Sequence, residues 1–166
     1  MFEGRCAFKY TMCTGIALAL SELPLELANC RDLEKRTFER GGEREVRFLF
    51  NSKGRLLPVW HEGQLKFSRW GSRRGESKVL PKTGWTWQES LNKGLWSGFN
   101  VEQVNIAASM GLENGIWFRI HQGIRGLLVF DEVGSPVVYM LCEPASHYYR
   151  TMTRSCRMPV LIGERI

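Results

Sequence analysis

The sequence lacks the features that mark several large classes of protein. Its five cysteines include no Cys-x-x-Cys pair and no cysteine–histidine cluster at zinc spacing, which argues against a bound metal. The apolar stretch 16–20 is too short to span a membrane, and no small-residue cleavage site follows it. Repeats and low-complexity segments are also missing. We expect a cytoplasmic protein with reduced thiols, no membrane partner, no metal and no cofactor.

The composition is that of one soluble domain. A chain of 166 residues with 43% hydrophobic content can bury one core and is short for two. The net charge of +6 and the pI near 9.3 favour a polyanionic partner. Since many basic domains bind nothing acidic, a purely structural domain remains an alternative.

The pattern along the chain predicts a leader and one domain. Residues 1–12 show no regular period and are expected to be a detachable leader, or not translated, before a single domain over 13–166. A short helix is expected over 21–27, and the charged stretch 31–45 is read as a solvated helix end with a turn at 41–42. Further helix is expected within 83–91, and over 145–153 with Pro144 at its first position.

Short strands separated by turn signals fill most of the remainder. They are expected at 46–50, 56–60, 65–70, 101–107, 116–120, 124–130, 136–142 and 158–162. The sum is an α+β fold dominated by a curled, largely antiparallel, barrel-like β-sheet with a few short helices.

Met12-Cys13 offers unusual chemistry. Cleavage between them, or initiation at Met12 and removal of that methionine, would leave Cys13 as an N-terminal residue. An α-amine with a pKa of about 7.7–8.0 would then lie beside a thiol with a pKa of about 8.5, and both could attack one aldehyde. An internal cysteine cannot do this.

The densest basic segment, residues 66–82, interleaves cations with tryptophan. Arginine and lysine neutralise phosphates and tryptophan stacks on unpaired bases, so the segment suits single-stranded nucleic acid. The alternative is a solvated loop whose tryptophans belong to the core. The residues concerned are Lys66, Arg69, Arg73, Arg74, Lys78 and Lys82, opposed only by Glu76, with Trp70, Trp85 and Trp87.

Two further residues are candidates for acid–base chemistry. Glu113 is expected in a glycine-flanked turn between apolar strands, where partial burial would raise the pKa of its carboxyl group. An ordinary turn is the alternative. His147 is expected on the last helix, where a histidine is more often structural than catalytic.

Four segments, taken in order, resemble the landmarks of the SRAP family, the SOS response-associated peptidases. That family begins Met-Cys-Gly-Arg, carries Asn-Ala-Arg-x-Glu-Thr and then a Gly-Phe-Tyr-Glu-Trp turn, and ends near His-x-Arg-Met-Pro-Val. The corresponding segments here are Met12-Cys13, Trp70-Gly71-Ser72-Arg73-Arg74-Gly75-Glu76-Ser77, Gly111-Leu112-Glu113 and Arg157-Met158-Pro159-Val160-Leu161.

The resemblance implies an SRAP-like fold and a covalent mechanism. Cys13 would form a thiazolidine with the ring-opened aldehyde of an abasic site in single-stranded DNA, and Glu113 would transfer protons. Members with a leader are thought to cut it off themselves, which here would be peptidase activity at Met12–Cys13. The implied protein is a monomer of bacterial or phage type, cytoplasmic and nucleoid-associated when bound to DNA. Its DNA contacts would come from Trp70, Ser72, Arg73, Arg74, Glu76, Trp117 and Arg157.

The sequence departs from the family pattern at two positions. Ser72 stands at the family's asparagine and Ser155 at its histidine, and a serine cannot replace an imidazole as a base near pH 7. His147, about two helical turns upstream, is a candidate substitute. Alternatives therefore stay open: a single-stranded nucleic-acid-binding module without chemistry, or a cysteine hydrolase that uses internal Cys13 or Cys156 with a histidine.

Overall fold

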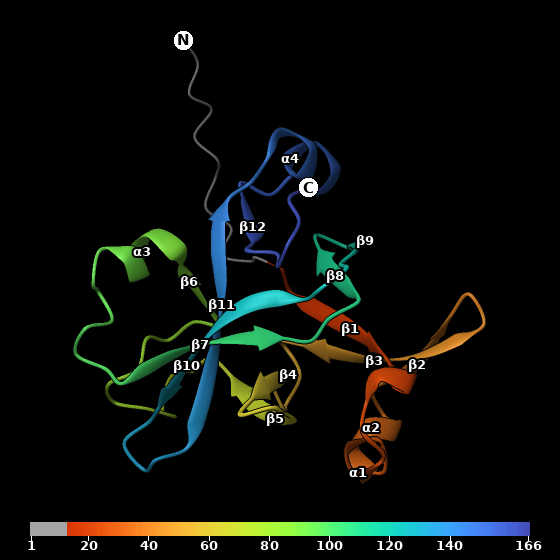
Figure 1. Ribbon diagram of the computed structural model, residues 1–166, viewed down its shortest axis with the longest axis horizontal. Coiled ribbons are helices and arrows are strands. Elements are labelled where there is room, and N and C mark those ends of the chain that lie inside the picture. Colours follow the sequence, from red (N-terminus) through yellow and green to blue (C-terminus); the bar gives the residue numbers. More distant parts are fainter. Residues whose placement is uncertain (1–12) are drawn as a thin grey trace.

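The computed structural model describes residues 13–166, so the expected leader and Met12 lie outside the described residues. The described chain is α+β and mostly strand (Figure 1). None of its helices combines the length and the apolar character that crossing a bilayer requires. The elements are β1 (Gly15–Ala19), the 3-10 turn η1 (Leu20–Glu22), α1 (Leu25–Ala28), α2 (Arg31–Glu34), β2 (Thr37–Arg40), β3 (Glu43–Leu49), β4 (Leu56–His61), β5 (Gln64–Trp70), β6 (Trp85–Trp87), α3 (Gln88–Asn92), β7 (Val101–Ile106), β8 (Met110–Glu113), β9 (Ile116–Arg119), β10 (Ile124–Phe130), β11 (Pro136–Pro144), α4 (His147–Thr153) and β12 (Arg157–Pro159).

Five strands close into a barrel, which confirms the barrel-like part of the expected fold. In the order β7, β4, β5, β11 and β10, each strand pairs with the next, and β10 pairs back to β7. All of these pairings are antiparallel except β5 with β11. β11 is long enough to carry β6 and β12 beyond the barrel. Closure leaves these barrel strands without a free edge.

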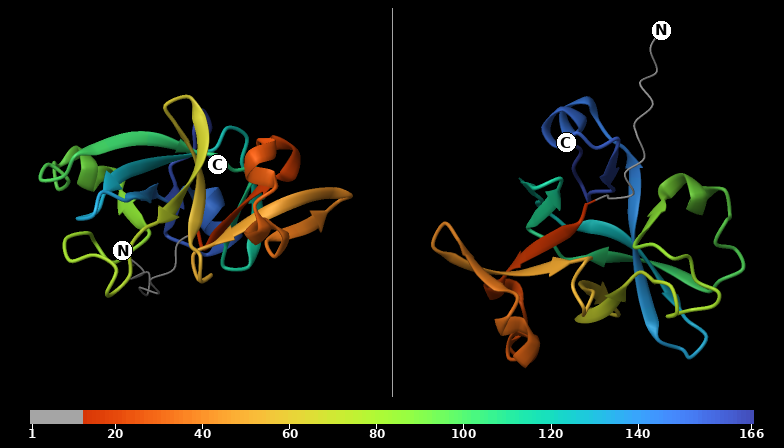
Figure 2. Two further views of the ribbon diagram at one scale, coloured as in Figure 1. Left: turned by 90° about the horizontal axis from the view of Figure 1, so that it is seen from below. Right: turned by 180° about the vertical axis from the view of Figure 1, so that it is seen from behind.

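A second sheet lies beside the barrel, with the strand order β2-β3-β1-β8-β9. Its β2–β3 hairpin projects away from the barrel, on the side where α1 and α2 lie (Figures 1 and 2). The fold is therefore two sheets rather than one curled sheet. β1 is the central strand, since it pairs with β3 along one edge and with β8 along the other. Its apolar residues on both faces are buried except Ala19, which is partly exposed.

The β8–β9 hairpin corrects the expectation of a plain turn around Glu113. β8 begins at Met110, so Glu113 is the last residue of a strand rather than part of a loop. The two-residue connection is Asn114-Gly115, with φ of 48° and 79°. A two-residue turn with both residues in the left-handed region matches the twist of the two strands, and asparagine and glycine adopt that conformation most readily. Gly111 packs against Phe118 so closely that a Cβ would lie 2.3 Å from the ring.

Helix α4 lies near the β8–β9 hairpin and next to β12 (Figure 1). The helix begins after Ser146, whose hydroxyl accepts a hydrogen bond from the Tyr149 backbone amide at 3.0 Å. Ser146 rather than Pro144 thus sets its start, because Pro144 still belongs to β11. A serine N-cap satisfies an amide that the first helical turn leaves unpaired.

Candidate functional site

Cys13 and Glu113 meet where β1 begins and β8 ends. The two strands are antiparallel, with Gly15 opposite Leu112, and the Thr14 amide donates to the Leu112 carbonyl at 2.7 Å. This pairing brings the backbone amide of Cys13 to the Glu113 carboxylate. Both side chains are fully buried. A thiol, a carboxyl group and the nitrogen of Cys13 therefore share one enclosed site.

Burial raises the pKa of the Glu113 carboxyl group to about 7. The cause is desolvation, which penalises the ionised form. The Cys13 amide and the Tyr149 hydroxyl oppose the rise. Within residues 13–166, Oε1 of this carboxylate meets no hydrogen-bond partner. Glu113 is thus an acid–base group that titrates near neutral pH and has one unengaged oxygen.

The Cys13 thiol is a neutral group in this state. Desolvation and then the Glu113 charge raise its pKa to about 12, against smaller opposing effects from the backbones of Leu112 and Gly15. The sulfur is 3.3 Å from the Gly15 carbonyl oxygen, to which the thiol donates. Because the thiolate is the nucleophile, an internal Cys13 is a poor one near pH 7. This counts against the cysteine-hydrolase alternative.

Tyr149 completes the site and was not among the expected residues. Its hydroxyl donates to Glu113 Oε2 at 3.3 Å, and its ring meets Phe118 edge-on with centroids 5.2 Å apart. Tyr149 and Thr153 are the buried residues of α4. Because residues four apart lie on the same face of a helix, this spacing is the sequence signal that could have predicted that both side chains are buried.

Neither His147, the expected substitute for the family's histidine, nor Ser155, which stands at that histidine's position, contacts Cys13 or Glu113 through a hydrogen bond among residues 13–166. His147 is exposed on α4, two positions from Tyr149 and hence on another face of the helix. Ser155 is buried, and its hydroxyl donates to the Arg157 carbonyl at 2.9 Å. The assignment of His147 as a replacement acid–base group is therefore wrong.

The basic segment is more structural than expected. Trp70 is fully buried, and its indole N–H donates to the Gly84 carbonyl at 2.9 Å, so its ring cannot stack on a base. Ser72 is buried as well, with its amide bonded to the Thr83 carbonyl. Both expectations of direct DNA contact fail because these side chains face the protein interior.

Glu76 is the partner of a buried arginine that the sequence did not single out. Its carboxylate accepts two hydrogen bonds from Arg55, at 2.9 and 2.5 Å, and one from the Arg73 amide at 2.8 Å. These contacts lower the pKa of Glu76, with the Arg55 hydrogen bond as the main cause. Glu76 thus holds the loop through Arg55 and the Arg73 amide.

Phe50 connects this loop to the cysteine. Its amide donates to the Thr14 carbonyl at 3.0 Å, and its own carbonyl accepts a hydrogen bond from the Arg73 guanidinium. Arg73 also lies 5.2 Å over the Phe50 ring. Two hydrogen bonds, through Phe50, therefore connect Thr14 to Arg73, and the exposed Arg74 follows Arg73 in the chain.

Two other expected DNA contacts have cation–aromatic neighbours. The half-buried Trp117 ring lies beneath the guanidinium groups of Arg40 and Arg47, at 4.7 and 5.0 Å. The guanidinium of Arg157 lies 4.6 Å over the Trp87 ring. Trp117 is thus shielded in part by arginines of its own chain.

Cys142 and Cys156 offer no second nucleophilic site. Cys142 is buried, its thiol donates to the Thr86 carbonyl, and burial raises its pKa to about 12. Cys156 is disulfide-bonded, contrary to the expectation of reduced thiols, and so supplies no thiolate. Within the part of the chain that the structure describes, no cluster of three or more metal-ligating side chains occurs.

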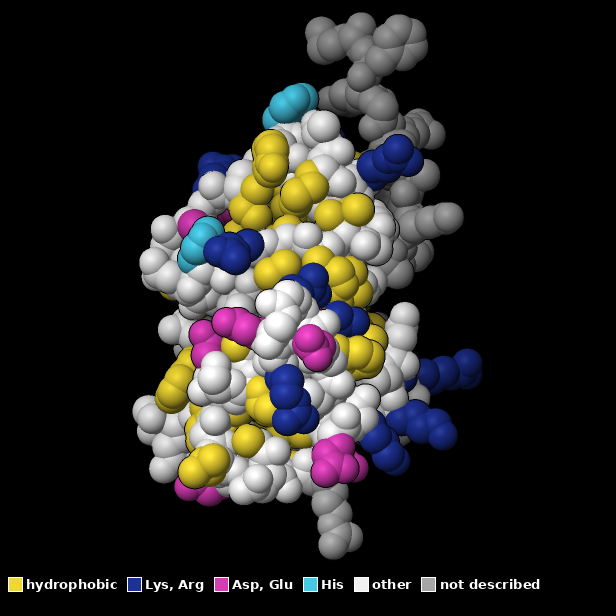
Figure 3. Space-filling model, turned by 90° about the vertical axis from the view of Figure 1, so that its right-hand side faces the viewer, with side chains coloured by type: hydrophobic (Ala, Val, Ile, Leu, Met, Phe, Trp, Pro, Cys, Tyr) yellow, Lys and Arg dark blue, Asp and Glu magenta, His cyan; other side chains and the backbone are white. Residues whose placement is uncertain are grey.

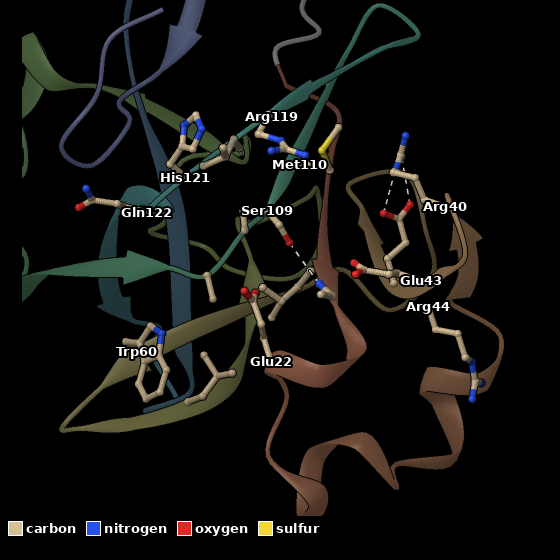
Figure 4. Close-up of a pocket in the computed structure, with 17 residues that line it drawn as sticks. Glu22, Arg40, Glu43, Arg44, Trp60, Ser109, Met110, Arg119, His121 and Gln122 are labelled. Carbon is tan, nitrogen blue, oxygen red and sulfur yellow. Dashed lines mark hydrogen bonds and ion pairs between the residues drawn. The ribbon is translucent and has the colours of Figure 1, made fainter.

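A pocket of about 640 Å³ lies at the other end of β1, away from Cys13 (Figure 4). Labelled residues around it include Glu22, Glu43, Trp60 and Arg119. Its lining mixes both signs of charge, so it shows no preference for an anion. On the face shown in Figure 3, basic, acidic and hydrophobic side chains are likewise interspersed.

No protein-family model, curated protein or solved structure matches the chain. The resemblance to the SRAP family accordingly rests on the four ordered sequence segments alone.

Proposed function

We propose that the protein captures abasic sites in single-stranded DNA, forming a thiazolidine crosslink through Cys13 once this residue is the N-terminus. The observation that carries the proposal is the contact between the backbone nitrogen of Cys13 and a buried carboxylate that titrates near neutral pH. That nitrogen is the atom that would become the α-amine.

Glu113 suits the proton transfers that such a crosslink needs. An α-amine has a pKa of about 7.7–8.0, so a neighbouring group with a pKa of about 7 can both take and return a proton near neutrality. The ionised carboxylate takes a proton from the attacking amine. The resulting carboxylic acid returns it to the oxygen that leaves as water.

The reaction balances with one molecule of water released. The Cys13 nitrogen bonds to the aldehyde carbon, and loss of water leaves a carbon–nitrogen double bond. The Cys13 sulfur then bonds to the same carbon, while the thiol proton moves to the nitrogen. Both groups of one residue are used, so the reaction requires a free N-terminus at Cys13.

A free N-terminus could arise by either of two routes. Hydrolysis of Met12–Cys13 consumes one water and cuts the chain after residue 12, which is the peptidase activity that the resemblance implies. Initiation at Met12 followed by removal of that methionine gives the same end. The neutral thiol of internal Cys13 agrees with a protein that acquires its reactivity only after this step.

Charge supports a DNA strand as the carrier of the aldehyde. The chain has a net charge of +6, and the exposed Arg74 lies on the loop that Phe50 connects to Thr14. A guanidinium group can bind a phosphate through two parallel hydrogen bonds. We assign Arg74 to the phosphate beside the abasic site.

Intact-mass analysis tests the proposal. Full-length protein is incubated with a single-stranded oligonucleotide containing one abasic site, and with a matched oligonucleotide whose site has been reduced to the alcohol. The mass is measured after reduction of disulfides, and the expected product then lacks residues 1–12 and carries the mass of the aldehyde oligonucleotide minus one water. The reduced oligonucleotide and Cys13→Ala should give no adduct. An uncut wild-type chain without adduct refutes the proposal.

Complete burial of Cys13 favours one alternative, a binding module without chemistry. Such a module would bind single-stranded DNA in a salt-dependent manner through its basic residues. Cys13→Ala would then bind as tightly as the wild type, and neither protein would form an adduct.

A further inference from the structure

The chain's three histidines all lie away from the Cys13 site. His61 contacts Glu102 at 3.0 Å, His121 pairs with Glu164, and His147 is exposed on α4. An acid–base site without an imidazole needs another group to fix its carboxylate. Tyr149 is the side chain that meets Glu113 from α4.

Three contacts hold the Tyr149 hydroxyl in place. The ring packs edge-on against Phe118, which lies on the same hairpin as Glu113. The Ser146 hydroxyl accepts a hydrogen bond from the Tyr149 amide. The Asn114 side chain donates to the Thr153 carbonyl at 2.8 Å, which ties the end of α4 to the turn after Glu113. The helix and the hairpin are therefore joined on both sides of the tyrosine–glutamate contact.

The two oxygens of Glu113 differ as a result. Oε2 accepts the phenolic hydrogen bond, whereas Oε1 is buried and meets no hydrogen-bond partner within residues 13–166. A buried acceptor without a partner is costly, and such an atom commonly marks a functional role. Oε1 is the oxygen of Glu113 that is left free to take up or release a proton.

We propose that Tyr149 is the positioning residue of this site, because its hydroxyl holds Glu113 Oε2 and leaves Oε1 free to take up a proton. A catalytic role for Tyr149 depends on the proposed crosslinking function. The effect of Tyr149 on the pKa of Glu113 can be measured without any reaction.

The phenol is suited to this role because it stays neutral. Burial, followed by the nearby Cys13 and Glu113, raises the pKa of Tyr149 far above its ordinary value. Its hydrogen bond favours the ionised carboxylate and lowers the pKa of Glu113. Tyr149 is the titratable side chain that acts on Glu113, beside the backbone amide of Cys13, whereas the Cys13 thiol is neutral where Glu113 titrates. Loss of the hydroxyl should therefore move the titration of Glu113 upward.

The test compares wild type with Tyr149→Phe, which removes only the hydroxyl, and with Tyr148→Phe as a control at an exposed position. Crosslinking rates are measured against pH, and carbon NMR of labelled Glu113 follows its carboxyl group in protein without DNA. We expect the Tyr149→Phe midpoint to rise by about one pH unit in both measurements, the typical size of one hydrogen bond to a charged group. Tyr148→Phe should match the wild type.

The outcomes separate the two proposals. Identical titrations in wild type and Tyr149→Phe overturn the positioning role, even if both form adducts. A wild type that forms no adduct at any pH overturns the proposed function, and the NMR titration still decides whether Tyr149 acts on Glu113. If Tyr149→Phe does not fold, the Tyr149 Cζ resonance of the wild type supplies the test. It should shift with the Glu113 midpoint, and an invariant resonance refutes the coupling.

Discussion

Replacing Glu113 with glutamine should change how the stability of the protein depends on pH. Glu113→Gln keeps the shape of the side chain and an oxygen that can accept the Tyr149 hydrogen bond, but it removes the titration. In the folded wild type this carboxyl group has a pKa of about 7 instead of 4.5. The folded protein therefore holds the Glu113 proton over a pH range in which the unfolded chain has lost it.

The sign and size follow from that difference. Below pH 4.5 both states are protonated and Glu113 imposes no ionisation penalty. Between about pH 4.5 and 7 the folded state binds more protons, so its stability falls as pH rises. Above pH 7 both states are ionised, and the shift of about 2.5 pKa units (7 − 4.5) corresponds to a penalty of about 3 kcal/mol.

Urea unfolding at a series of pH values from 4 to 8 measures the effect. The free energy of unfolding of Glu113→Gln minus that of the wild type should increase by about 3 kcal/mol across this range. Taking the difference cancels the titration of groups that both proteins share. A difference that stays constant with pH would show that Glu113 is not desolvated in the folded state, and would remove the basis for its acid–base role.

Three further changes probe the surroundings of the site. Arg55→Met should destabilise the protein by about 2 kcal/mol in urea unfolding, because the Glu76 carboxylate loses its ion-pair partner but stays partly hydrated. An unchanged urea midpoint would contradict this. Gly111→Ala should cost about 2–3 kcal/mol, since its Cβ would overlap the Phe118 ring, and thermal unfolding at wild-type temperature would refute that packing. Glu132→Gln should destabilise the fold at neutral pH and progressively less as pH falls toward 2, because its hydrogen bonds, the Ser77 hydroxyl first, lower the pKa of Glu132 to about 2; acid titration followed by circular dichroism checks this.

Strand patterns were predictable where turn chemistry marked both ends. The hairpins β4–β5 and β10–β11 match their expected positions closely, since glycine-containing turns separate runs of apolar residues. β1 and β2 were not recognised as strands. β1 is buried on both faces, so its sequence does not alternate between polar and apolar residues. β2 lies within the charged stretch that was read as the end of a helix. Both depend on neighbours supplied by β3 and β8, which a local pattern cannot reveal.

The sequence allowed some residues of the site to be selected by their chemistry, but it did not show which contacts they make. Cys13 and Glu113 were selected by chemistry and by the family resemblance, and their proximity depends on the β1–β8 register. Trp70 was misassigned because a tryptophan next to cations reads the same way whether it anchors a core or stacks on a base. Tyr149 escaped notice because an inward-facing tyrosine gains its meaning only from the carboxylate that it meets.

Pairing between distant parts of the chain also determines at what stage of synthesis and folding the Cys13 site can form. β1 leaves the ribosome early, yet its central position requires β8, and the Glu113 contact requires α4, which lies beyond residue 146. The barrel likewise closes only when β11 pairs with β5, and such long-range pairings form slowly. A nascent chain that ends before α4 carries the cysteine and the carboxylate without the tyrosine. The proposed cleavage before Cys13, as a reaction of the complete site, would therefore follow synthesis, whereas removal of an initiator Met12 would need none of these contacts.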